Sequence, residues 1–158
     1  MATNEPSHLI DTSAIVNFAA LYGDSDNAWS TLITEITEGR LKTVRHCWDE
    51  LKRKFPDIFK RVKPLRKEFV VADSVLYADE AVAEVQQIQE HHGKLINELG
   101  AGNPADPFLI ATAKVMNIVV VTDEKTSGHG HKHCIPYVCK NRNVGCKSGP
   151  DYFKELGF

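Results

Sequence analysis

The chain has 158 residues, of which 42% are hydrophobic and 25% charged, and its formal net charge is −2. This composition predicts one soluble globular domain spanning residues 1–158, with a substantial buried core. Its apolar runs are much shorter than the roughly 20 residues of a membrane span, and the N-terminus has no signal-peptide pattern, so a cytoplasmic protein without a membrane partner is expected.

Short strands alternate with helices along the chain. The pattern predicts a strand at residues 8–11, a helix at 14–21, a helix capped by Asp26 or Asn27 and stopped by Gly39, and a strand at 41–44. A helix at about 47–54, a short basic helix after Pro56, a third strand at 69–72 and a long helix at about 78–99 follow. Asp106 and Pro107 then open a helix, and a strand at 118–122, helical turns at 138–143, a strand at 144–147 and a helix at 152–156 complete the chain. This order predicts an α/β fold with a mostly parallel sheet of four to five short strands.

Four acidic residues stand where carboxylates would meet at the carboxyl edge of such a sheet: Asp11, Glu50, Asp106 and Glu124. Gathered together, these carboxylates would repel one another unless a hard cation bridged them. The positions therefore predict a site for Mg²⁺ or Mn²⁺.

Each acid also has a simpler explanation when it is taken alone. Asp11 and Asp106 could be helix N-caps, and Glu50 could favour the dipole of a helix whose first turn it occupies. Asp123 and Glu124 could be ordinary turn residues after a strand.

The charge is unevenly distributed. Eight Lys and Arg residues lie between Lys52 and Lys67, with only Asp57 opposing them, whereas acidic residues gather between Asp73 and Glu90. A basic face beside an acidic metal site suits a polyanion such as nucleic acid, although a solvated surface of mixed charge explains the run equally well.

Four segments carry a resemblance to a known family. They are LIDTS at residues 9–13, WDEL at 48–51, ADPFLIATA at 105–113 and VVTDE at 120–124. In this order they resemble the PIN-domain nucleases, which include the VapC-type toxins. The DTS and ADPFLIATA segments are the more specific of the four.

The resemblance implies a three-layer α/β/α fold and a metal-dependent endoribonuclease that leaves a 5′-phosphate and a 3′-hydroxyl. Asp11, Glu50 and Asp106 would bind the Mg²⁺ or Mn²⁺, and the fourth acid would be Glu124, where the family usually has Asp. Asp123 could substitute for Glu124 or assist it, and the hydroxyls of Ser13 and Thr122 would hold carboxylates or water in place.

The resemblance also implies partners. These are RNA, a cognate antitoxin protein if the chain is the toxin of a toxin–antitoxin pair, and a second copy in a homodimer. Candidates for contact with the RNA backbone are Lys52, Arg53, Lys60 and Arg61.

A histidine-rich segment has two interpretations. His129, His131 and His133 alternate before Cys134, with Cys139 and Cys146 further on, so a zinc site has suitable ligand types. The spacing matches none of the usual zinc modules, and a polar loop near the active edge is the alternative. All four cysteines, Cys47 included, are otherwise expected to be reduced thiols.

Two other functions compete with the nuclease. A phosphatase with an aspartyl nucleophile also begins with a strand and an Asp, but it needs a second acid where this chain has Ser13. A degenerate PIN domain that binds RNA or protein without catalysis is the stronger alternative, because Glu124 departs from the family pattern.

Overall fold

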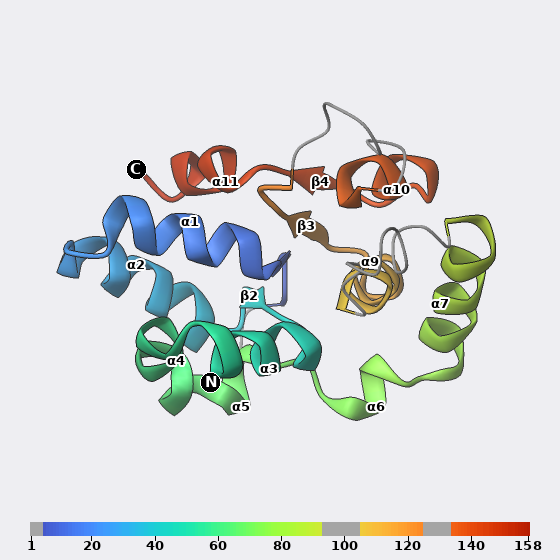
Figure 1. Cartoon of the computed structure of the whole chain (residues 1–158), viewed down its shortest axis with the longest axis horizontal. Helices are drawn as coiled ribbons and strands as arrows, with labels where there is room; N and C mark the ends of the chain where they lie inside the picture. Colours follow the sequence, from blue (N-terminus) through green and yellow to red (C-terminus); the bar gives the residue numbers. More distant parts are fainter. Residues whose placement is uncertain (1–4, 93–104, 125–133) are drawn as a thin grey trace.

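A four-stranded sheet with every strand parallel lies at the centre of the computed structural model (Figure 1). The strand order is β2-β1-β3-β4, and the strands are β1 (His8–Ile10), β2 (Leu41–Lys42), β3 (Val119–Val121) and β4 (Cys146–Lys147). The structure describes residues 5–92, 105–124 and 134–158, except the side chains of residues 105 and 106.

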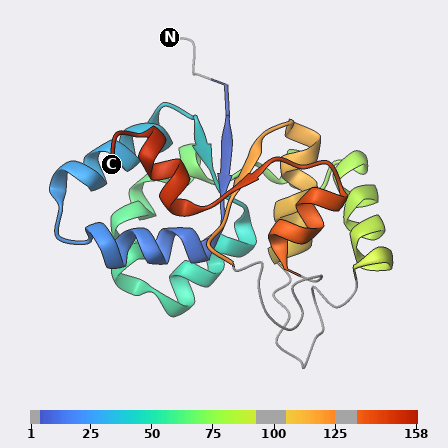
Figure 2. The same cartoon turned by 90° about the horizontal axis from the view of Figure 1, so that it is seen from above.

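Helices cover both faces of the sheet. They are α1 (Thr12–Tyr22), α2 (Asp26–Thr37), α3 (Arg45–Lys54), α4 (Pro56–Val62), α5 (Arg66–Phe69), α6 (Asp73–Leu76), α7 (Asp79–His91), α9 (Ala105–Met116), α10 (Ile135–Asn141) and α11 (Gly149–Glu155), with a 3₁₀ turn at Lys63–Leu65. Figure 2 shows α1, α2, α4 and α11 on one side of the sheet and α7, α9 and α10 on the other. The predicted three-layer α/β/α architecture with a parallel sheet is confirmed.

Alternating side chains of the central strands divide the core in two. Leu9 and Val120 point into a cluster built with α7, α9 and α10, whereas Ile10 and Val121 point into one built with α1, α2 and α11. Successive residues of a strand face opposite sides of a sheet, so each strand contributes to both clusters. Such apolar runs are typical of parallel strands that are covered on both faces.

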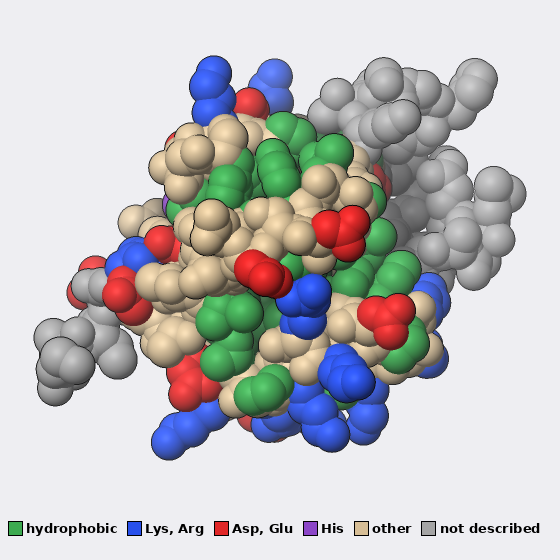
Figure 3. Space-filling model, turned by 90° about the vertical axis from the view of Figure 1, so that its left-hand side faces the viewer, with side chains coloured by type: hydrophobic (Ala, Val, Ile, Leu, Met, Phe, Trp, Pro, Cys, Tyr) green, Lys and Arg blue, Asp and Glu red, His purple; other side chains and the backbone are tan. Residues whose placement is uncertain are grey.

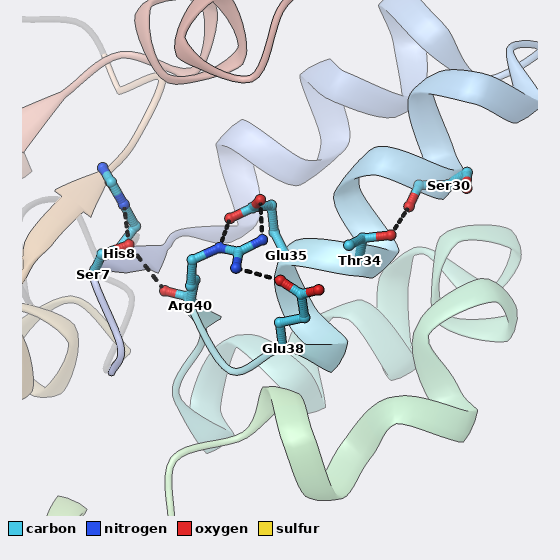
Figure 4. A network of polar contacts seen from close by, with 7 residues as sticks. All are labelled: Ser7, His8, Ser30, Thr34, Glu35, Glu38 and Arg40. Carbon is cyan, nitrogen blue, oxygen red and sulfur yellow. Dashed lines mark hydrogen bonds and ion pairs between the residues drawn. The ribbon is translucent and has the colours of Figure 1, made fainter. Parts of the chain in front are cut away.

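The amino end of the sheet is held by a network around Arg40, which follows α2 (Figure 4). The Arg40 guanidinium donates two hydrogen bonds of 2.7 Å to Glu35 and also pairs with Glu38. The Arg40 carbonyl accepts hydrogen bonds from the His8 backbone N–H at 3.2 Å and the Ser7 hydroxyl at 3.3 Å. These contacts fix the start of β1, whose other end carries Asp11.

The prediction of a third strand at residues 69–72 is wrong as stated. The segment 66–69 is the helix α5, and Val70 forms a single parallel bridge to Thr43 beyond the end of β2. The bridge lies at the position where a fifth strand would extend the sheet. Basic helix-forming residues before Phe69 favour helix there and leave too short a segment for a strand.

Several predicted boundaries also shift. Ser25, rather than Asp26 or Asn27, caps α2, because its hydroxyl accepts from the Ala28 N–H at 3.2 Å. α3 begins at Arg45 and α10 at Ile135, both earlier than predicted. α9 begins at Ala105, so Asp106 lies inside its first turn instead of at the N-cap. The predicted helix at 78–99 is described as α7 to His91, and its last residues lie outside the described ranges.

Candidate active site

Asp11 lies directly after β1 and is 5% exposed. It occupies the N-cap position of α1, yet its side chain makes no capping hydrogen bond. Instead, its Oδ2 accepts hydrogen bonds from the Ser13 hydroxyl at 2.7 Å and the Thr122 hydroxyl at 2.9 Å. The explanation of Asp11 as a simple helix cap therefore does not fit the structure, and two hydroxyls hold the carboxylate in one orientation.

The surroundings of Asp11 disfavour its charge. Burial raises the pKa of this carboxyl, the hydroxyls of Ser13 and Thr122 partly oppose the rise, and the negative charge of Glu50 adds to it. None of the ion pairs among the described residues includes Asp11. A buried carboxylate with a second carboxylate nearby and no basic partner is electrostatically unfavourable until a cation arrives.

Glu50 and Asp106 are carried by two helices that pack together. α3 begins at Arg45, so Glu50 lies in its second turn and not in the first, where a charge would interact most with the helix dipole. His46, one turn before Glu50, stacks on Phe108 of α9 with ring centroids 4.5 Å apart. Since Phe108 follows Asp106 by two residues, this contact joins α3 to the first turn of α9.

Asp123 and Glu124 follow β3 and have different contacts. The Asp123 carboxylate accepts hydrogen bonds from the Gly149 N–H at 2.6 Å and from the Asn17 side chain at 2.8 Å. A Cβ atom on Gly149 would lie 2.8 Å from those carboxylate oxygens, so a larger residue there would have to displace the Asp123 carboxylate. Asp123 therefore ties the first turn of α11 to α1.

The Glu124 carboxylate belongs to the neighbourhood of Asp11. Burial raises the pKa of Glu124, a hydrogen bond from the Ile135 N–H opposes the rise, and the charge of Asp11 adds to it. The Ile135 N–H lies 3.3 Å from Oε2, and the Glu124 N–H donates to the Thr122 hydroxyl at 3.2 Å. Glu124 thus connects Thr122, which orients Asp11, to the start of α10.

The carboxylates around Asp11 have the chemistry of a site for a hard cation. Asp11, Glu50 and Glu124 supply oxygen donors, which Mg²⁺ and Mn²⁺ prefer. Among the side chains that the structure describes, no group of three His, Cys, Asp or Glu is arranged to hold a metal ion. The Asp106 side chain is outside that set, so the four predicted ligands remain a prediction.

All four cysteines are free thiols. The Cys47 Sγ lies 3.9 Å from Asp11 Oδ1, which is a contact that the sequence analysis missed. A hydrogen bond between the Cys139 and Cys146 thiols raises the pKa of Cys139 and lowers that of Cys146. The histidines of the zinc interpretation lie outside the described residues.

A cavity of about 1170 Å³ opens beside Glu124. Its lining includes Thr122, Asp123 and Glu124 after β3, and residues of α1, α10, β4 and the start of α11. The sequence analysis named none of the helical residues of this lining. The helical spacing of Asn17, Ala20 and Leu21 places them on one face of α1, but periodicity alone does not tell an exposed face from a buried one.

The basic residues predicted to contact RNA lie on α3 and α4. Lys52, Arg53, Lys60 and Arg61 are all exposed. Figure 3 shows Lys and Arg side chains along the lower part of its face, where Figure 1 places α4 and α5. Arg61 also has a structural role, because its guanidinium lies 4.8 Å from the Trp29 ring centroid and donates to the Gly23 carbonyl at 3.3 Å.

None of the described helices is both long and apolar enough to cross a lipid bilayer.

Comparisons with known proteins identify a family and a fold. Residues 8–158 match a family model described as "Domain of unknown function (DUF4411)", whereas no curated protein matches the sequence. The structure is similar to that of PAE2754 from Pyrobaculum aerophilum, with 16% identity and a TM-score of 0.55 over 98% of each chain. It is also similar to VapBC-1 from nontypeable Haemophilus influenzae, with 12% identity and a TM-score of 0.54 over 90% of this chain and 98% of that one. The predicted PIN-like fold is thereby confirmed.

Proposed function

Because the chain belongs to the DUF4411 family and has the fold of PIN-domain nucleases of the VapC type, we propose that it is a metal-dependent endoribonuclease. One observation carries the proposal. Asp11 is a buried carboxylate that neighbouring carboxylates destabilise, and the two hydroxyls on it fix its orientation without neutralising its charge. Burial beside other carboxylates costs stability when no cation is present, and a cation bound at Asp11 would offset that cost.

We assign the cation to Asp11, Glu50, Asp106 and Glu124. Glu124 is preferred to Asp123 as the fourth acid, since the Asp123 carboxylate is used by Gly149 and Asn17. The longer side chain of Glu124 suits a carboxylate that must also accept from the start of α10.

In this proposal, the bound metal ion, the hydroxyls that hold Asp11 and the basic helices have separate roles in hydrolysis. Bound Mg²⁺ or Mn²⁺ supplies an acidified water and neutralises charge that builds on the scissile phosphate. Ser13 and Thr122 hold Asp11 Oδ2, so the carboxylate does not have to reorient when substrate binds. The basic residues of α3 and α4 would attract the RNA backbone.

Asp11→Asn tests the proposal, because it keeps the shape of the side chain and removes its charge. We expect labelled RNA to be cleaved by wild type with added Mg²⁺ or Mn²⁺, not with EDTA, and at least about 100-fold more slowly by the variant. Circular dichroism confirms that the variant is folded. Cleavage that persists in the variant or in EDTA would overturn the proposal.

A matched pair of variants tests which of the two acids after β3 is the fourth metal ligand. Glu124→Gln should lower the cleavage rate strongly, whereas Asp123→Asn should leave the chemistry intact and affect mainly the stability of α11. The opposite result would assign the fourth acid to Asp123.

The partners follow from the same resemblance. The likeness to VapBC-1 supports the proposal that this chain is the toxin of a toxin–antitoxin pair and binds a small antitoxin. The homodimer is proposed only from the family resemblance of the sequence motifs. Expression should then arrest growth, and co-expression of a small protein encoded beside it should restore growth. Unchanged growth on expression of soluble, active protein would argue against the toxin role.

A binding module without catalysis is the second candidate. The observation that favours it is the hydrogen bond between Glu124 Oε2 and the start of α10, which gives this acid a structural use. Folded wild type that binds RNA but cleaves none in any of the divalent cations would support the binding module.

A further inference from the structure

Two cysteines meet where the chain turns back from α10 to β4 (Figure 1). The Cys139 carbonyl accepts hydrogen bonds from the backbone N–H groups of Arg142 at 3.2 Å and Val144 at 2.8 Å, which close this turn. Asn143 adopts the left-handed conformation there, with a φ of 60°, and Asn tolerates it better than most residues do. Cys146 follows Val144 by two residues and packs against the core cluster that contains Cys139.

The two sulfur atoms have different surroundings. Cys139 is fully buried, whereas Cys146 is half-buried and lines the cavity beside Glu124. The Cys139 thiol donates a hydrogen bond to the Cys146 sulfur, and this bond lowers the pKa of Cys146 against the opposing effects of burial and of nearby carboxylates. The same bond, together with burial, raises the pKa of Cys139. A small molecule in the cavity therefore reaches Cys146 first, with the protonated Cys139 thiol directly behind it.

Neither a disulfide nor a metal site accounts for this pair. Both cysteines are free thiols in the structure. Among the side chains that the structure describes, no group of three His, Cys, Asp or Glu is arranged to hold a metal ion, and two sulfur donors are fewer than the four ligands of a structural zinc site. The chemistry that two thiols in contact do support is reversible oxidation.

We propose that Cys139 and Cys146 are a modification site, at which hydrogen peroxide closes a disulfide between α10 and β4. The site goes beyond the proposed ribonuclease function and does not depend on it. α10 begins where the Ile135 N–H donates to Glu124, and β4 pairs with β3, which leads to the same acid. The disulfide would thus link two elements that adjoin Glu124. Because a dithiol reductant reverses the reaction, the pair is a redox switch and not a permanent cross-link.

The oxidation proceeds in two balanced steps. The Cys146 thiolate attacks one oxygen of hydrogen peroxide, the O–O bond breaks, and hydroxide leaves and takes up the proton that Cys146 released, so that Cys146 becomes a sulfenic acid. The Cys139 sulfur then attacks the Cys146 sulfur, the S–O bond breaks, and the leaving hydroxyl takes the Cys139 proton to form water. Hydrogen peroxide is uncharged, so the carboxylates that also line the cavity do not repel it.

Peptide mapping tests the pairing. Folded wild type is treated with hydrogen peroxide and then denatured in iodoacetamide, which blocks the remaining thiols, before digestion with trypsin. Trypsin cleaves after Lys140 and Arg142, so Cys139 and Cys146 fall in separate peptides that their disulfide would join. We expect the joined peptides in most of the oxidised protein and none after dithiothreitol.

Alanine variants assign the sulfur atoms. Cys134 shares the tryptic peptide of Cys139 but lies five residues before it, at the N-cap of α10, so Cys134→Ala is the matched control. The joined peptides should persist in Cys134→Ala and vanish in Cys139→Ala and Cys146→Ala. In Cys139→Ala the sulfenic acid of Cys146 is not resolved and should accumulate, where dimedone traps it, whereas wild type should yield several-fold less adduct.

The disulfide should also stabilise the folded protein. Oxidised wild type and oxidised Cys134→Ala should unfold roughly 5 °C above their reduced forms, because the bond restricts the unfolded chain, and Cys146→Ala should show no rise. Cys47, which is buried beside Asp11, should remain a thiol throughout and is the internal control.

Four results would overturn the proposal. They are the absence of joined peptides from folded wild type, joined peptides that persist in Cys139→Ala, equal dimedone trapping in wild type and Cys139→Ala, and a fall in Tm on oxidation. None of these measurements uses RNA or a metal ion. A failure of the redox site therefore leaves the ribonuclease proposal intact, and an inactive protein that still forms the disulfide would reject only the ribonuclease.

Discussion

Asp11 lies in surroundings that favour its protonated form. Burial and the nearby Glu50 raise the pKa of its carboxyl above the usual value. The folded protein therefore holds the proton more tightly than the unfolded chain does, and stability falls as the pH rises through the ordinary range of Asp, roughly pH 4 and above. In the absence of a cation, the carboxyl of Asp11 therefore lowers the stability of the fold at neutral pH.

Asp11→Asn should consequently stabilise the metal-free protein. Asn keeps an oxygen that can accept from Ser13 and Thr122 and removes the buried charge. We expect the free energy of unfolding at pH 7 to increase by about 0.5–2 kcal/mol, and the increase to disappear as the pH falls below about 4. Urea denaturation at both pH values with EDTA measures this. Asp24→Asn, at an exposed position between α1 and α2, is the control, and a destabilised Asp11→Asn would contradict the assignment.

At the scale of elements, the helices on the α7 side are joined by one carboxylate. Glu84 of α7 accepts a 2.7 Å hydrogen bond from Arg142, which follows α10, and a 3.3 Å hydrogen bond from Lys114 of α9. The Glu84 side chain is 11% exposed. Burial alone would raise the pKa of Glu84, but the hydrogen bonds from Arg142 and Lys114 outweigh it and lower the pKa.

Glu84→Gln should therefore destabilise the protein in a pH-dependent way. A lowered folded pKa gives stability that is present above the unfolded pKa of Glu, roughly 4.3, and is lost as the pH falls through the folded value. We expect a loss of about 1–3 kcal/mol at pH 7 that shrinks toward pH 3. Thermal unfolding at several pH values tests this, with the exposed Glu90→Gln on the same helix for comparison. A loss that does not depend on pH would mean that the ion pairs contribute nothing.

The strands show which parts of the fold could be predicted from the sequence and which could not. β1 and β3 are predicted well, because apolar runs between polar breaks are local signals. The segment at 69–72 is predicted wrongly, since its single bridge to Thr43 depends on tertiary contacts that no local pattern encodes.

The same limit applies to the candidate site. Asp11 and Thr122 are 111 residues apart and could be placed together only through the family motifs. No motif signals the role of Asp123 in holding Gly149, the contact of Cys47 with Asp11 or the residues of α10 that line the cavity. These features became visible only in the structure.

At the scale of the whole molecule, a bound cation should couple the site to global stability. The four proposed ligands follow the central strands β1 and β3 or lie on α3 and α9, so a ligand that binds only the assembled site stabilises the entire fold. At a concentration of 100 times its Kd, such a ligand adds about 2.7 kcal/mol, which corresponds to a rise in Tm of roughly 5–10 °C for a chain of this size.

The order of stability of wild type and Asp11→Asn should therefore reverse with metal. Without metal the variant should unfold at the higher temperature, because it lacks the buried charge. With saturating Mg²⁺ or Mn²⁺ wild type should gain the larger increase in Tm and overtake the variant, because the same charge now binds the cation. Differential scanning fluorimetry of protein without a metal-affinity tag measures both orders. Equal shifts in the two proteins would place the cation elsewhere, for example in the segment that holds His129, His131 and His133, and would separate Asp11 from metal binding.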